Sequence, residues 1–473
     1  ATNPPITVEI EEVPTERGTV LVVLVPDSPV LHCTTSGKYL RRVGRSCEPI
    51  PPHQITAVLV EKGQLDYTSM PVPGAELDDL DETALRALRG LAAAREANSE
   101  LARLPEHDFL LALELVRRQG GKLIPTVAGL LLAGRQEALR EHVPGAGIVY
   151  LRFAGEALEY EYREEIFRPA PQAVERVSEL IEARNAVHTL SIGLVRLDIP
   201  DFPREAYREA LLNAACHRDY TQPDWVYVYH WPDRLKVASP GGFLRGITPR
   251  NILHHRPRHR NPALARAFQR LGYVEQAGIG VDRMFRVLLA YGKEPPEFAE
   301  EATSVEVTIR DGTFDRAFTA FVAEEERAGR PLSLDQLLVL AHVRRNRWID
   351  RGTAAAVCQR SEREAGEVLA HMVRRGLLER RGVRGGAEYH LPPRLYRLAG
   401  EQAAYVRERG LDAARAREMI LAYARTWGEI TNEKCRTLCG LSFAQASRLL
   451  TDLTREGLLR REGRGRYTRY RPA

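Results

Sequence analysis

The sequence predicts a mixed α/β (α+β) protein made of several domains, and three observations lead to this prediction. The chain has 473 residues, too many for one hydrophobic core, and its 44% hydrophobic and 28% charged content is typical of soluble globular proteins. Apolar runs typical of strands alternate with helical periodicity between residues 121 and 310. From residue 331 onward, short helical segments followed by basic turns occur twice.

The N-terminal segment, residues 1–70, shows three strand patterns separated by turns. Residues 6–10 and 38–44 alternate between apolar and polar side chains, and residues 19–25 form an apolar run. Three strands alone make a poor domain. We therefore expect either that the first half of this domain is missing or that a partner supplies the rest of its sheet.

A helical linker region is predicted at residues 71–120, followed by a domain of alternating strands and helices at residues 121–310. The predicted helices cover residues 81–103, 106–119, 172–186 and 204–215, and another begins at Pro125. The predicted strands cover residues 147–153, 160–163, 193–197, 224–231, 234–239 and 304–310. The sequence has no G-x-x-x-x-G-K motif, which excludes a P-loop ATPase or helicase motor.

The helix predicted at residues 204–215 carries the main chemical signal. Glu209, Asn213 and His217 follow one another at intervals of four residues, so they share one helix face. A carboxylate, an amide and an imidazole suit a polyphosphate with a hydrated Mg²⁺, because this ion keeps several waters and needs few protein ligands. The competing interpretation is a polar stripe that faces solvent.

Two glycine-rich turns follow this helix in the chain. The first contains Ser239, Gly241 and Gly242, and the second contains Gly278 and Gly280. Glycine allows backbone N–H groups to approach a phosphate closely. We expect both turns to close over the same nucleotide as the helix stripe.

The C-terminal repeat predicts two winged-helix domains, at residues 311–398 and 399–473. In each copy a helix that starts at a serine, Ser361 or Ser442, ends in Arg-x-Gly-Leu-Leu and leads into an arginine-rich turn. In a winged helix, one helix enters the major groove of DNA and the hairpin contacts the backbone. The candidate DNA-binding residues all lie in the second copy: Arg448, Arg455, Arg464, Arg466 and Arg469.

The charge distribution also favours the C-terminal end as the part that binds a polyanion. Residues 311–473 contain 31 Arg and Lys against 21 Asp and Glu, whereas the whole chain has a net charge of +5. The first copy of the repeat is less basic on its presumed recognition helix, with Glu362, Glu364 and Glu367 beside Arg363. Protein docking is therefore the alternative role for that copy.

Cysteine and histidine usage gives weaker signals. Six cysteines at irregular spacing, no signal segment and no apolar run long enough to cross a bilayer favour a cytoplasmic protein. Cys435 and Cys439 are interpreted as small buried side chains. His254, His255 and His259 lie among arginines, so we interpret this segment as a basic lid that contacts phosphate rather than as a metal site.

At these motifs the chain resembles a bacterial family of transcriptional regulators. That family joins a Schlafen-type AlbA-like domain to a divergent GHKL-type ATP-binding domain, which carries a RecG-like C-terminal annotation, and to winged helices. The matching motifs are Pro125-Thr126-x-x-Gly129, Arg208-Glu209-Ala210-x-x-Asn213-Ala214-x-x-His217, Ser239-Pro240-Gly241-Gly242, Arg260-Asn261-Pro262 and Gly278-x-Gly280. Residues 18–50 resemble only the second half of the AlbA-like domain, without the acidic residues of its nuclease relatives.

The resemblance implies roles for several residues, with ATP and Mg²⁺ as cofactors. Glu209 would orient the attacking water, Asn213 would hold Mg²⁺, and the turn at residues 278–281 would cradle phosphate at a helix N-terminus. Residues 250–260 would form a mobile lid. The superfamily places an aspartate where this chain has Ser239, so the resemblance leaves the preferred base open.

Three functions are compatible with these patterns. The first is a DNA-binding regulator, in a bacterial defence or stress locus, whose winged helices respond to nucleotide in the middle domain. The second is a DNA-dependent ATPase or another enzyme that processes nucleic acid. The third is a scaffold subunit with a degenerate nucleotide site. The resemblance also implies a homo-oligomer.

Overall fold

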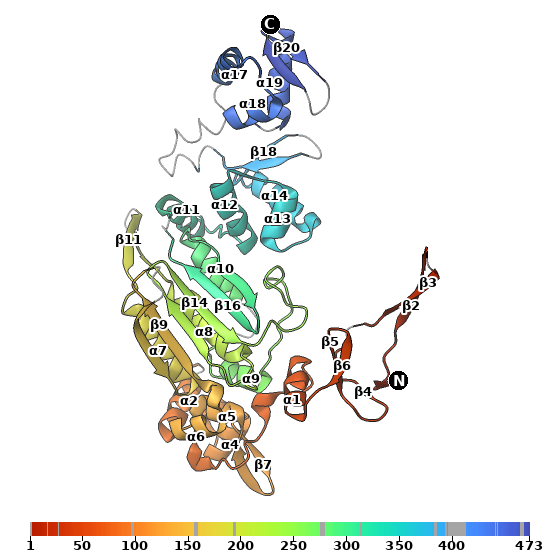
Figure 1. The fold of residues 1–473 in the computed structure, drawn as a ribbon. Helices are drawn as coiled ribbons and strands as arrows, with labels where there is room; N and C mark the ends of the chain where they lie inside the picture. Colours follow the sequence, from red (N-terminus) through yellow and green to blue (C-terminus); the bar gives the residue numbers. More distant parts are fainter. Residues whose placement is uncertain are drawn as a thin grey trace. The chain divides into compact units, whose positions relative to one another are not determined.

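The computed structural model contains helices and several β-sheets, which confirms the mixed α/β class (Figure 1). It divides into two compact units, Ala1–Phe314 and Asp315–Ala473. The structure describes residues 2–16, 18–26, 28–95, 99–155, 159–192, 195–274, 280–312, 315–382, 386–392, 395, 413–439, 441, 443–463 and 468–473.

The N-terminal segment consists of small two-stranded sheets. The pairs are β1 (Thr2–Asn3) with β4 (Cys33–Thr34), β2 (Glu9–Thr15) with β3 (Gly18–Leu24), and β5 (Leu40–Val43) with β6 (Ser46–Pro49). The strand predicted at residues 6–10 corresponds to β2, which begins three residues later, at Glu9. Nearly every side chain of these strands is exposed, so they add little to the core. Helix α1 (Pro52–Glu61), with proline at its first position, follows.

A mainly helical segment comes next, and one of its predicted helices is corrected. The elements are η1 (Tyr67–Ser69), η2 (Leu77–Asp79), α2 (Glu82–Arg95), α3 (Glu100–Arg103), α4 (Glu106–Ala112), β7 (Val116–Gln119), β8 (Lys122–Pro125), α5 (Val127–Ala133), α6 (Gln136–His142) and η3 (Pro144–Ala146). The helix predicted at residues 106–119 ends at Ala112, because Glu114 adopts a left-handed conformation with φ 57°. Residues 116–119 form a strand instead, paired with β8.

The main sheet in the described part of the chain has six strands in the order β10-β9-β13-β14-β16-β15. These strands are β9 (Ile148–Phe153), β10 (Tyr160–Ile166), β13 (Val226–His230), β14 (Arg234–Pro240), β15 (Glu297–Glu301) and β16 (Ser304–Arg310). Only the β9–β13 pair is parallel within this sheet. The predicted strand at residues 193–197 becomes β12 (Val195–Pro200), which forms a separate hairpin with β11 (Val187–Ile192).

Helices cover one face of this sheet (Figure 1). Helix α8 (Arg204–His217) contacts β14 and β16, and it is flanked by α7 (Ala170–Glu182) and α10 (Gly280–Ala290). Helix α9 (Pro262–Arg270) contacts η1 and α5 of the preceding helical segment. A continuous hydrophobic core runs from Val72 to Ile309, so the helical segment and the sheet share one interior.

The second unit contains the sequence repeat, and the described residues of each copy form three helices followed by a β-hairpin. The unit opens with α11 (Arg316–Arg327). The first copy has α12 (Leu334–Asn346), β17 (Trp348–Ile349), α13 (Arg351–Cys358), α14 (Glu362–Arg374), β18 (Glu379–Arg381) and β19 (Glu388–His390). The second copy has α17 (Ala413–Trp427), α18 (Asn432–Cys439), α19 (Phe443–Arg455), β20 (Leu459–Glu462) and β21 (Arg469–Pro472). The predicted Ser361 is the N-cap of α14 and forms a capping box with Glu364.

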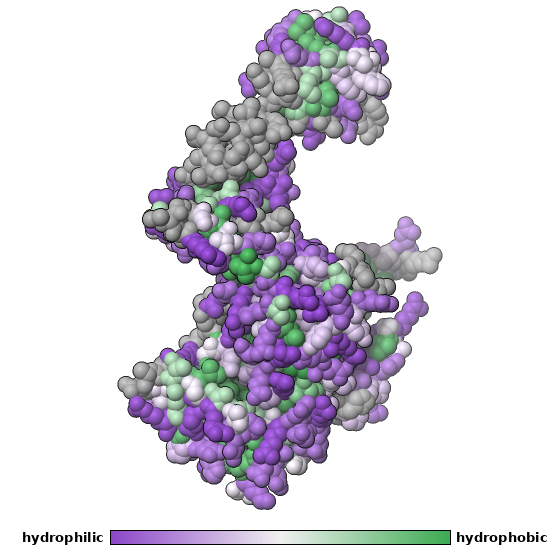
Figure 2. Space-filling model, turned by 90° about the vertical axis from the view of Figure 1, so that its left-hand side faces the viewer, coloured by the Kyte–Doolittle hydropathy of each residue, from purple (hydrophilic) through white to green (hydrophobic). Residues whose placement is uncertain are grey.

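On the face that Figure 2 shows, hydrophilic residues prevail and hydrophobic residues occur in small groups. Among the residues that the structure describes, none of the helices has the length and apolar character needed to span a bilayer.

Candidate functional site

A cavity of about 250 Å³ lies beside α8, and it contains most of the predicted site residues. Its wall is formed by α8, the end of β14, the segment from Gly241 to Arg260, α9 and the start of α10. One part of the wall is apolar and includes Val237, Phe298 and Val307. Another part is cationic and includes Arg256, Arg258 and Arg266, whereas Glu209 is the one carboxylate among the described lining residues. This combination suits a ligand with an apolar ring and an anionic tail.

The polar stripe of α8 faces this cavity and not open solvent. Glu209, Asn213 and His217 all line it, and Glu209 is only 8% exposed. The amide Nδ2 of Asn213 donates to Oε1 of Glu209 at 3.0 Å. This bond leaves Oδ1 of Asn213 as the atom available to a ligand, and an amide oxygen is a suitable ligand for Mg²⁺. Among the described residues no three His, Cys, Asp or Glu side chains gather as a metal-binding group.

His217 is held as a neutral side chain. Its ring stacks on that of His259, with 5.5 Å between ring centroids and 27° between planes. Burial lowers the pKa of His217 to about 3, and the nearby His259 and Arg260 add to this shift. The imidazole at neutral pH therefore forms part of the wall and supplies no positive charge to a phosphate.

The first glycine turn requires glycine for steric reasons. Ser239, at the end of β14, is buried and donates from Oγ to the carbonyl oxygen of Ala214 at 3.2 Å. Gly241 has φ 100°, a conformation that other residues rarely adopt. A Cβ on Gly242 would lie 2.2 Å from Oε1 of Glu300.

The end of the second glycine turn meets the α8 stripe. Gly280 is the first residue of α10 and lines the cavity. A Cβ on Gly280 would lie only 1.8 Å from Oε1 of Glu209, so the start of α10 packs directly on this carboxylate. Gly278 lies outside the described residues. The structure thus brings Glu209, Asn213, both described glycines of the first turn and Gly280 to one cavity.

The Arg260-Asn261-Pro262 motif has a structural role. The buried Arg260 donates to the carbonyl oxygens of His217, at 2.9 Å, and Gly242, at 2.5 Å. Asn261 donates from Nδ2 to the carbonyl oxygens of Cys216 and Arg218, at 2.9 and 2.8 Å. Together they satisfy the carbonyl groups at the C-terminus of α8, which have no partner within the helix. The last residue of the predicted lid is therefore tied to α8, while His255, Arg256 and Arg258 line the cavity.

Two lining residues on α9 were not anticipated. Arg266 and Gln269 lie on the cavity wall, within the same helix that the Pro262 motif begins. Arginine is abundant along the whole chain, so nothing in the sequence distinguishes Arg266 from its neighbours. Its position follows only from the packing of α9.

The candidate DNA-binding residues lie in the second copy of the repeat. Arg448 and Arg455 are exposed on α19, seven residues apart and thus on the same face. Arg469, on β21, is exposed and donates to Glu429 at 2.6 Å. Arg464 and Arg466 lie outside the described residues.

Comparisons with known proteins match two segments of the Ala1–Phe314 unit to domain families. Residues 224–309 match the family described as "Putative ATP-dependent DNA helicase recG C-terminal" (HATPase_c_4). Residues 57–148 match a "Domain of unknown function" (DUF8451). None of the curated proteins matches the chain. Among solved structures, the DIP2311 protein from Corynebacterium diphtheriae is similar, at 22% identity and a TM-score of 0.58, over 98% of this chain and 80% of that chain.

The first family match supports an ATP-binding domain in this part of the chain. The matched segment includes the first glycine turn, Arg260 and α10, whereas α8 precedes it. Contacts of α8 with β14 and α10 join the Glu209 stripe to the matched segment. The likeness to the DIP2311 protein shows the fold alone.

Proposed function

We propose that this protein is a DNA-binding regulator in which a magnesium-bound nucleotide, such as ATP, occupies the cavity and modulates DNA or partner binding by winged helices of the second unit. The observation that carries the proposal is the convergence of the α8 stripe with both glycine turns on one cavity. A cavity lined by both cationic and apolar side chains fits a triphosphate and a base.

Different residues would bind the metal and the phosphates of the nucleotide. Asn213 offers Oδ1 to the metal, because its Nδ2 is already bonded to Glu209. Bound Mg²⁺ would neutralise charge on the phosphate oxygens. Gly241 and Gly280 let the backbone come close to the ligand, and the cations Arg256 and Arg258 face the phosphates.

DNA binding is assigned to the second copy of the repeat as a winged helix. The exposed face of α19 carries Arg448 and Arg455, and β21 of the hairpin that follows carries Arg469. Arg464 and Arg466 are added to this set from the sequence alone. The corresponding helix of the first copy, α14, pairs Arg363 with Glu367 at 2.8 Å and is the more acidic surface. We assign partner binding to that copy, and a homo-oligomer is the arrangement that we expect.

A second candidate function is a DNA-dependent ATPase. The observation that favours it is the carboxylate of Glu209, which is buried in the cavity and could orient a water for attack on a phosphate. In a regulator or a scaffold, by contrast, Glu209 would only bind Asn213 and would not activate water.

Two measurements on the full chain separate these functions. Fluorescence anisotropy with a labelled duplex should show a DNA affinity that changes at least threefold when ATP and Mg²⁺ are added. Steady-state phosphate release, with and without DNA, should be negligible for a regulator. DNA-stimulated turnover that disappears in Glu209→Ala would favour the enzyme, and an affinity for DNA that ignores nucleotide would contradict the regulator.

A further inference from the structure

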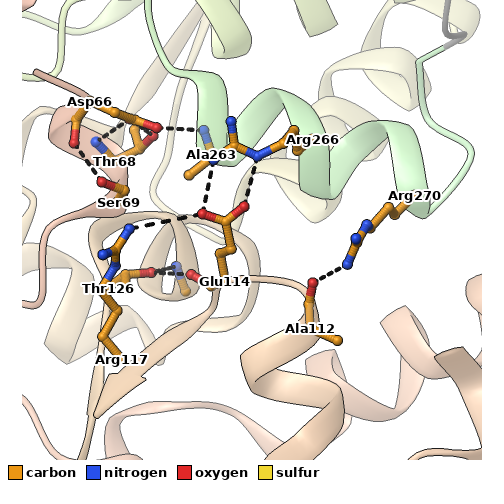
Figure 3. Close-up of polar contacts among 11 residues, drawn as sticks. Asp66, Thr68, Ser69, Ala112, Glu114, Arg117, Thr126, Ala263, Arg266 and Arg270 are labelled. Atoms are coloured by element: carbon orange, nitrogen blue, oxygen red, sulfur yellow. Dashed lines mark hydrogen bonds and ion pairs between the residues drawn. The ribbon is translucent and has the colours of Figure 1, made fainter. Parts of the chain in front are cut away.

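Residues 57–148, which match a domain family of unknown function, form several polar contacts with α9 (Figure 3). Helix α9 forms one wall of the cavity. The carboxylate of Asp66 accepts a hydrogen bond from the backbone N–H of Ala263 at 2.7 Å, which satisfies a donor at the start of α9. Arg270, at the other end of α9, donates to the carbonyl oxygen of Ala112. Between them, Glu114 binds Arg266.

Glu114 and Arg266 form a bidentate ion pair. Arg266 donates from Nε to Oε1 at 2.7 Å and from Nη2 to Oε2 at 2.9 Å. Such a bidentate pair fixes the plane of the guanidinium group. The pairing lowers the pKa of Glu114, so the carboxylate stays ionised at neutral pH.

The sequence motif Pro125-Thr126-x-x-Gly129 explains why Glu114 is held in place. Thr126 donates from Oγ1 to the carbonyl oxygen of Glu114 at 2.7 Å and from its backbone N–H to that of Leu115 at 2.9 Å. A Cβ on Gly129 would lie 2.0 Å from the Leu115 carbonyl oxygen, so only glycine lets α5 pack this closely against the backbone of Leu115. These contacts secure Glu114 in its left-handed conformation at φ 57°.

The remaining edge of the Arg266 guanidinium is available to a ligand. Nε and Nη2 are occupied by Glu114, whereas Nη1 has no hydrogen-bond partner among the described residues. Arg266 also lines the cavity that contains Glu209 and Gly280. Arg256 and Arg258, in contrast, extend from a loop, and no carboxylate partner within the described residues orients either of them.

We infer that Arg266 binds the β- or γ-phosphate of the nucleotide through Nη1, and that Glu114 is a positioning residue that presents it. The inference rests on the proposed nucleotide site. It gives the segment at residues 57–148 a role, because this segment supplies the carboxylate that orders a phosphate-binding arginine. A guanidinium that is already oriented loses less conformational entropy when the phosphate arrives.

Titration calorimetry of the full chain with ATP, AMP and adenosine tests this inference. Arg266→Gln should weaken ATP binding about 10- to 100-fold, as expected for a lost charge-assisted hydrogen bond. Glu114→Gln should weaken it about 3- to 10-fold. Adenosine affinity should remain within about twofold in both variants, because adenosine has no phosphate. The double variant should bind ATP no more weakly than Arg266→Gln alone, because Glu114 acts through Arg266.

Arg270→Gln is the matched control, since Arg270 anchors the same helix without lining the cavity. It should leave ATP affinity within about twofold of wild type. An equal loss in Arg270→Gln and Arg266→Gln would assign the effect to the docking of α9 and overturn the inference. Unchanged ATP affinity in Arg266→Gln would also overturn it while leaving the proposed function intact. Wild-type protein that binds no nucleotide at all would remove both.

Discussion

Gly280 and Glu209 lie so close that a Cβ on the glycine would fall 1.8 Å from Oε1 of the carboxylate. Gly280→Ala should therefore push the Glu209 side chain out of its hydrogen bond with Asn213. We expect the free energy of unfolding to fall by about 1–3 kcal/mol, from overpacking and the lost hydrogen bond. Nucleotide affinity should fall at least tenfold, and calorimetry and thermal unfolding check the two effects.

Gly90→Ala is the control for this substitution. Gly90 is exposed within α2, and nothing lies within 4 Å of the position its Cβ would take. Alanine there should stabilise the protein by about 0.5–1 kcal/mol without changing nucleotide binding. A Gly280→Ala variant that behaves like Gly90→Ala would show that the close approach of α10 to α8 contributes neither to nucleotide binding nor to stability.

Ser239 predicts a preference for adenine over guanine. Its hydroxyl proton is directed to the carbonyl oxygen of Ala214 at 3.2 Å, so Oγ can offer only lone pairs to a base in the cavity. Lone pairs suit the amino group of adenine and repel the O6 carbonyl of guanine. Competition calorimetry should show ATP binding more tightly than GTP, and Ser239→Ala should reduce this preference about 3- to 10-fold. Tighter binding of GTP to wild type would refute this assignment.

The exposed face of α19 predicts how DNA affinity depends on salt. Arg448→Ala and Arg455→Ala should each weaken duplex binding and lower the slope of log affinity against log salt by about one. Arg363→Ala, on the equivalent helix of the first copy, should leave both quantities unchanged because Glu362, Glu364 and Glu367 make that helix acidic. Fluorescence anisotropy over a salt series measures the slopes. Equal effects at all three arginines would argue against groove binding by the second copy.

Two histidines with lowered pKa values predict a loss of stability in acid. Burial lowers the pKa of His217 to about 3 and that of His230 to about 4. The unfolded chain, with histidine pKa values near 6.5, binds protons that the folded chain excludes. The contribution of these two histidines to stability should therefore be constant above about pH 6.5 and fall as the pH drops toward 3 to 4. In His217→Gln, chemical denaturation between pH 7 and 5 should show a smaller loss than in wild type. An unaltered pH dependence in this variant would contradict the assignment to His217.

Local patterns predicted much of the fold, and the main errors have specific physical causes. The strand at residues 304–310 and the start of α14 after its N-cap Ser361 follow from alternation and capping. The helix predicted through residue 119 stops early because Glu114 takes a left-handed conformation, a state that glutamate rarely adopts. β15 was missed because Glu297–Glu301 is mostly acidic and has almost no strand pattern.

The candidate site was predicted where its residues form motifs and missed where it depends on packing. The four-residue spacing of Glu209 and Asn213 predicted that they share a helix face. In the structure, contacts of α8 with β14 and α10 bring both residues to the glycine turns. Arg266 belongs to no such pattern. Its role depends on Glu114, which is 152 residues away in the chain, and no local signal joins such a pair.

The most direct test of the central claim is titration calorimetry of the wild-type chain with ATP, with and without Mg²⁺, beside Asn213→Leu. The claim predicts binding at one site per chain that weakens at least tenfold when Mg²⁺ is removed. In Asn213→Leu the dependence on Mg²⁺ should largely disappear. The absence of binding to ATP and GTP, with or without Mg²⁺, would contradict a nucleotide site formed by α8 and the two glycine turns.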